Sequence, residues 1–157
     1  MTKNRISASL TPEDKLAVLA AIDAIKEKLP FLLGLSPEES KSLLRLGDKS
    51  RGFVAKALEV ATQNPDFLPR SFDIEEMRKD VELFEALYPI TLALSQLQEL
   101  LDDTVALAGS EAYMAALAVY NYAKATKGDA GLEAAVDDMA RRFARKSSSW
   151  ASQQPES

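Results

Sequence analysis

The sequence contains no histidine and no cysteine. Imidazole groups perform much of the acid–base catalysis near neutral pH, and thiolate or imidazole ligands hold zinc, haem iron and iron–sulfur clusters. Ser-His-Asp and Cys-His mechanisms therefore cannot be assembled from this chain alone, and we expect no cofactor. These exclusions favour a role that is not enzymatic, without deciding the matter.

Basic residues are missing from the centre of the chain. No lysine or arginine occurs from Asp80 to Ala123, a stretch with seven acidic residues, and the formal net charge is −5. Nucleic-acid phosphates require a basic face, so we expect no nucleic-acid partner. The one concentrated basic run is expected in the last turn of a helix, where cations offset the negative helix end; it comprises Arg141, Arg142, Arg145 and Lys146.

Long apolar runs are also absent. No run reaches the roughly 18 residues that a membrane-spanning helix needs. The start of the chain, Met1–Ser7, has basic residues but is not followed by the apolar segment of a secretory signal. We therefore expect a cytoplasmic protein, with a membrane as an unfavoured partner.

Helix-start signals recur along the chain. Thr11-Pro12 and Ser36-Pro37 each place a capping hydroxyl before a proline suited to the first helical turn, and Asp73 precedes Glu76 in a further capping pattern. Apolar residues three and four positions apart follow these signals. The sequence predicts an all-α fold, an antiparallel helical bundle of five main helices plus one short helix.

The third main helix is predicted to be long and kinked, from about residue 73 to residue 108. Pro89 lies in its middle, lacks a backbone N–H and clashes with the preceding turn. Gly109-Ser110 is expected to end it and to cap a fourth helix over 111–126. Because 86–98 and 112–123 are uncharged, these two helices are expected at the buried centre. One apolar stripe of the long helix comprises Leu83, Leu87, Ile90, Leu94, Leu97, Leu101 and Val105.

The length of 157 residues suits one compact domain and is short for two. We expect an N-terminal extension over 1–10, a single helical-bundle domain over 11–146 and a flexible polar tail over 147–157.

Two sets of polar residues are candidate sites. Tyr113, Tyr120 and Asn121 could line a small-ligand pocket between the third and fourth helices, or could belong to a structural hydrogen-bond network. Glu99, Asp102 and Asp103 stand at i, i+3 and i+4, a spacing that could bring carboxylates together around a divalent cation. Solvated or salt-bridged carboxylates are the alternative.

The connector over 29–35 is the longest apolar run that is rich in large side chains, and it contains one glycine. Burial beneath the bundle is the favoured interpretation. Exposure would instead indicate a surface that contacts a partner or a membrane, formed by Phe31, Leu32, Leu33 and Leu35.

Several short segments carry a resemblance. They are Leu46-Gly47-Asp48-Lys49-Ser50, Gln63-Asn64-Pro65, Leu101-Asp102-Asp103-Thr104, Gly109-Ser110-Glu111-Ala112-Tyr113 and Tyr120-Asn121. Their order over residues 5–145 resembles a group of uncharacterised bacterial helical-bundle proteins with no assigned activity. The resemblance implies a bacterial origin and a helical domain, and it assigns no site residue.

The favoured function is a protein-interaction or structural module, with a homodimer or another protein as partner. The apolar surface of the long helix exceeds what one neighbouring helix would cover. The alternative is a bundle that binds a small ligand or a divalent cation.

Overall fold

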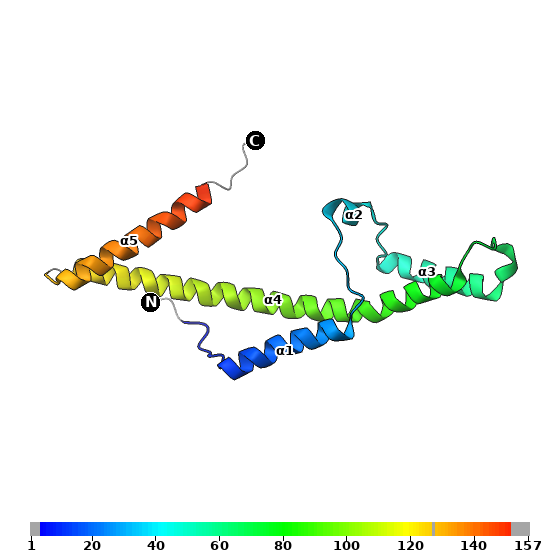
Figure 1. Cartoon of the computed structure of the whole chain (residues 1–157), viewed down its shortest axis with the longest axis horizontal. Coiled ribbons are helices and arrows are strands. Elements are labelled where there is room, and N and C mark those ends of the chain that lie inside the picture. The colour runs from blue at the N-terminus through cyan, green and yellow to red at the C-terminus, as the bar shows by residue number, and fades with distance from the viewer. Residues whose placement is uncertain (1–3, 127, 152–157) are drawn as a thin grey trace. The chain divides into compact units, whose positions relative to one another are not determined.

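The computed structural model describes residues 4–126 and 128–151, with side chains as far as Ala144. Every regular element in these residues is a helix and none is a strand, which confirms the all-α prediction. Figure 1 shows the helices in chain order. They are α1 (Pro12–Lys28), α2 (Pro37–Ser42), α3 (Asp48–Gln63), the short 3-10 helix η1 (Pro65–Phe67), α4 (Ile74–Ala125) and α5 (Ala130–Ala151).

The chain divides into two compact units. One is Ala8–Gln98, and the other combines the described residues of Met1–Ser7 and Glu99–Ser157. The helix α4 belongs to both units. The single domain expected over 11–146 stays a prediction. The bundle arrangement and its antiparallel packing stay predictions.

The helices begin where the capping signals predict. The Thr11 hydroxyl accepts a hydrogen bond from the Asp14 backbone N–H at 3.1 Å. At α2, Ser36 and Glu39 exchange both bonds of a capping box, at 3.2 Å and 2.8 Å. Asp73 accepts from the Glu76 N–H at 2.9 Å at the start of α4. Each cap satisfies amide groups that have no partner within the helix.

The long kinked third helix predicted from the sequence is not what forms. The long helix is α4, the fourth α-helix in chain order, and its 52 residues pass through both Pro89 and Gly109-Ser110. The two helices expected over 73–108 and 111–126 are therefore one helix. With the short α2 included, the described chain has five α-helices instead of six.

Gly109 keeps a helical backbone conformation, and α4 continues through it. The left-handed conformation that lets a glycine end a helix occurs, among the described residues, only at Gly128, with φ of 96°. Leucine- and alanine-rich segments flank Gly109 on both sides. Helix propagation is cooperative, so strong helix formers on both sides outweigh the local cost of about 1 kcal/mol for one glycine.

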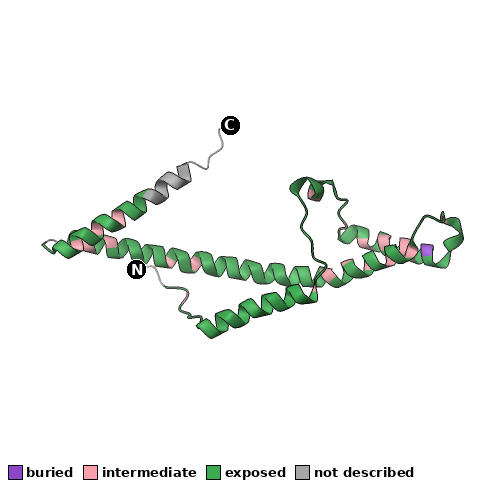
Figure 2. Ribbon diagram, in the orientation of Figure 1, coloured by how far each residue is buried: buried purple, intermediate pink, exposed green. Residues whose placement is uncertain are grey.

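The expected buried centre is wrong. Ala61 in α3, with 4% of its surface exposed, is the one buried residue among those described, and α4 contains none. Figure 2 shows this distribution: half-buried positions gather where α3 runs beside the first part of α4, and the middle of α4 is exposed. The uncharged segment over 86–98 forms an apolar surface, most of which is exposed.

The C-terminal helix extends further than expected. α5 reaches Ala151, so the predicted tail over 147–157 overlaps the helix, and residues 152–157 lie outside the described part. The last turn of α5 contains no basic residue. The basic run that starts at Arg141 therefore does not occupy the helix end, contrary to expectation.

A pair of glycine substitutions tests the continuous α4. No heavy atom lies within 4 Å of a Cβ built on Gly109, so Gly109→Ala should raise the free energy of unfolding by up to about 1 kcal/mol. Gly128→Ala should lower it by about 1 kcal/mol, because an alanine is strained at positive φ. Thermal unfolding followed by circular dichroism measures both. Destabilisation by Gly109→Ala would show that a helix ends there.

Candidate functional site

The three residues predicted to line a pocket do line one. Tyr113, Tyr120 and Asn121 lie on α4 at i, i+7 and i+8, so they share one face of the helix. They border a pocket of about 480 Å³ whose opposite wall is α5. The predicted location is corrected, since the expected third and fourth helices are one and the second wall comes from the last helix. Other lining residues are Ala116, Leu117, Met139, Ala140, Arg142 and Phe143.

Aromatic contacts dominate this pocket. The rings of Tyr113 and Phe143 stack with centroids 6.5 Å apart and planes 22° apart. The ammonium group of Lys124 lies 5.9 Å from the centroid of the Tyr120 ring, within the range of a cation–π interaction. The pocket therefore offers flat, apolar walls and suits an apolar or aromatic group of small-ligand size.

The charges at the edge of the pocket are paired. Arg142 Nε donates to Asp138 Oδ2 at 2.9 Å, and Arg141 lies 3.9 Å from the same carboxylate. The hydrogen bond from Arg142 lowers the pKa of Asp138, and Asp138 in turn raises the pKa of Arg142. Both groups are therefore ionised at neutral pH and orient each other.

The predicted carboxylate site is not assembled. Glu99, Asp102 and Asp103 lie on α4, but the described residues contain no group of three acidic side chains placed to hold a metal ion. The neighbouring Glu111 instead accepts a hydrogen bond from the Arg5 backbone N–H at 2.7 Å. The spacing along the helix suits a cation, but a site also needs oxygen ligands from a second element.

The connector over 29–35 is exposed, which contradicts its expected burial. Phe31, Leu32, Leu33 and Leu35 have between 48% and 77% of their surface accessible. Pro30 stops α1, and the segment then continues without a regular helix as far as α2. These four side chains remain a candidate interaction surface.

A cluster around Arg51 was not predicted. Arg51 on α3 forms a two-pronged salt bridge with Glu85 on α4, with Nε to Oε1 at 3.1 Å. Its guanidinium lies 4.7 Å from the ring centroid of Tyr88 and 5.9 Å from that of Phe84. The sequence places these groups at helical spacing on two separate helices, and nothing in one sequence indicates that the two faces meet.

Tyr88 closes the cluster. Its hydroxyl donates a hydrogen bond to Asp48 Oδ1 at 3.1 Å. This bond, which only the neutral phenol can make, and the negative charge of Asp48 raise the pKa of Tyr88. The cluster fixes the start of α3 against α4.

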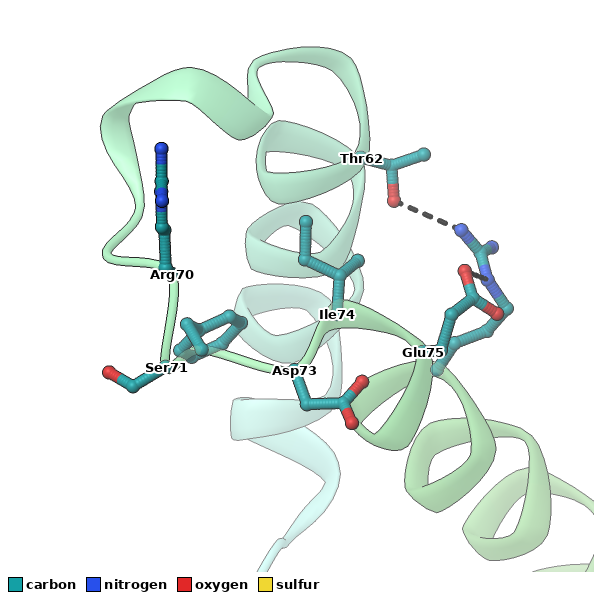
Figure 3. Close-up of a pocket in the computed structure, with 8 residues that line it drawn as sticks. Thr62, Arg70, Ser71, Asp73, Ile74 and Glu75 are labelled. Atoms are coloured by element: carbon teal, nitrogen blue, oxygen red, sulfur yellow. Dashed lines mark hydrogen bonds and ion pairs between the residues drawn. The ribbon is translucent and has the colours of Figure 1, made fainter.

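A second pocket, of about 510 Å³, lies where the loop after η1 enters α4. Figure 3 shows Thr62 from α3 facing the first turn of α4 across it. Arg78 contacts the Thr62 hydroxyl at 3.3 Å and Glu75 at 3.5 Å. These contacts hold α3 to the start of α4, which is a structural role.

No protein-family model, no curated protein and no solved structure matches this chain. In the described residues, no helix is both long enough and apolar enough to cross a lipid bilayer. The candidate sites therefore stand on their own geometry.

Tyr88 supplies a titration that tests the cluster. Its raised pKa means that the bond to Asp48 contributes stability below the ordinary pKa of 10.0, and that this contribution is lost as pH rises through the higher folded value. In a titration followed by tyrosinate absorbance, one component should appear only at a pH above the ordinary pKa of tyrosine. Both Tyr88→Phe and Asp48→Ala should remove this component. Tyr122→Phe should leave it in place. A component of this kind that survives Tyr88→Phe contradicts the assignment.

Proposed function

We propose that this chain is a non-enzymatic protein-interaction or structural module that associates with a second copy of itself. The observation that supports the proposal is the exposure of large apolar side chains along a helix. Ile90, Leu94, Leu97, Leu101 and Val105 on α4 each have between 39% and 63% of their surface accessible. Fully burying one such side chain contributes about 1.5–3 kcal/mol, so covering the exposed part contributes roughly 1 kcal/mol each.

The absence of basic residues favours another protein chain as the partner of this α4 surface. Neither nucleic acid nor an anionic membrane is attracted to a helix that lacks a basic residue from Asp80 to Ala123. Protein interfaces, in contrast, are depleted of charge at their centre and rich in apolar side chains.

Association would also complete the antiparallel bundle that the sequence predicts. Along α3 and α4 the contacts run in opposite order: Asp48 meets Tyr88, Arg51 meets Glu85, and Thr62 meets Arg78. This order supports antiparallel packing of that pair. The role also agrees with the resemblance to bacterial helical-bundle proteins, which stays a prediction.

Light scattering coupled to size-exclusion chromatography tests the proposal. The expected mass is about 34 kDa, twice the chain mass of 17.2 kDa, and it should persist in concentrated NaCl, because apolar association is not weakened by salt. A mass that falls to the monomer value in salt would indicate an electrostatic contact instead. A monomer over the whole accessible concentration range would overturn the proposal.

The pocket between α4 and α5 supports a second candidate function, the binding of a small aromatic ligand. Its aromatic and apolar walls and its volume of about 480 Å³ fall in the range of small-molecule sites. Asn121, Arg142 and the hydroxyls of Tyr113 and Tyr120 are the polar groups among its lining residues. They could orient a ligand that carries a hydrogen-bonding group.

Indole is a suitable probe of this pocket, and saturation-transfer NMR detects its binding. Ala140→Trp should fill the pocket and reduce the signal several-fold, because Ala140 lines it. Ala93→Trp, which places the same side chain on an exposed part of α4, is the control and should retain the signal. Equal signals from both variants would contradict a ligand site between α4 and α5.

A further inference from the structure

Apolar residues of α4, most of them exposed, follow a regular spacing. We call Leu83, Leu87, Ile90, Leu94, Leu97, Leu101 and Val105 the α4 stripe; its first six members are separated alternately by four and three residues, and Val105 follows four residues later. This is the seven-residue repeat that lets one helix pack along another. From Leu83 to Val105 the stripe is about 33 Å long at 1.5 Å per residue. Its members lie within roughly 60° of Leu94 around the helix.

Charged residues avoid both the stripe and its edges. In the repeat, the positions that flank a helix–helix seam are all uncharged between Phe84 and Leu107. Glu99, Asp102 and Asp103 lie roughly 80° to 180° around the helix from Leu94, at the outward positions of the repeat. A second α4 can therefore face this stripe without bringing carboxylates together at the seam.

We propose that the α4 stripe is the seam of the self-association, and that it packs against the same stripe of a second copy. This inference rests on the proposed function and names its contact surface. Two identical stripes are self-complementary, because both offer apolar knobs at the same spacing and both keep their acids outside. Exposure is highest at Leu97 and Val105, at 62% and 63%. Association would therefore bury the most water-accessible surface at the centre and the C-terminal end of the stripe.

Other occupants fit the stripe less well. An anionic bilayer would meet a helix that carries seven acidic residues and no lysine or arginine from Asp80 to Ala123. The helix α1 of the same chain has exposed apolar residues of its own, with Leu16 at 67% and Val18 at 55% exposed. A second copy supplies a surface of matching length and spacing.

Two leucines of one helix give a matched test. Leu97 lies in the stripe, whereas Leu92 lies on the outward side and is also about half exposed, at 53%. Leu97→Asp should raise the dissociation constant of the dimer by about 100-fold or more, because it places a carboxylate in the apolar seam. Leu92→Asp should leave the dissociation constant nearly unchanged. Circular dichroism confirms that both variants keep their helix content.

Cross-linking gives a second measurement, which does not depend on whether Leu97→Asp folds stably. The chain has no cysteine, so Leu94→Cys introduces a single thiol. A short bismaleimide should link two Leu94→Cys chains efficiently and two Leu92→Cys chains poorly, since the outward positions of paired helices are far apart. Efficient linking of Leu94→Cys alone supports the seam.

The failures of the two proposals are distinguishable. A wild-type dimer that survives Leu97→Asp, with equal linking at both cysteines, overturns the α4 seam and leaves self-association standing. In that case Phe31→Asp would test the exposed connector as the contact surface. A wild-type chain that stays monomeric overturns both proposals.

Discussion

The structure depends on one constraint: a helix satisfies its own backbone, but it cannot bury its own side chains. Over the 52 residues of α4 the hydrogen bonds run along the helix, so it persists without neighbours on every side. A single helix cannot remove its own apolar side chains from water, because burial requires a second surface. Most of α4 lacks that surface within the described chain, and the proposed function follows from this shortage.

The chain covers α4 in two places, each within one unit. At the start of α4, the Arg51 cluster joins α3 through a salt bridge, two aromatic rings and the bond from Tyr88 to Asp48. Near its end, the stacking of Tyr113 and Phe143 joins α5. Both contacts combine an aromatic ring with a nearby cation or a second ring, which gives geometry as well as apolar burial. The pocket between α4 and α5 is the space left by this second contact.

Local signals predicted three helix starts well, but they wrongly placed a helix end and a new helix start at Gly109-Ser110. Thr11, Ser36 and Asp73 act within a single turn, so their effect can be derived from neighbouring residues. Gly109 is a residue type that often ends a helix. Whether it adopts a positive φ and does so depends on how stable the helical segments on both sides are, and here they join into one helix. The grouping of Tyr113, Tyr120 and Asn121 was predictable from helical spacing. Their partner α5 was not, because one sequence does not say which helices meet.

By itself, the sequence determined the helical class, the capped helix starts, the acidic centre without lysine or arginine, and the spacing of the apolar stripe. These properties arise from residues a few positions apart, and local chemistry is sufficient for them. Only the tertiary structure decided that α4 is continuous, that α5 faces Tyr113, that Arg51 joins two helices, and that Phe31 is exposed. Each of these depends on which distant segments meet, and that choice is made by competition among apolar surfaces for burial across the whole chain.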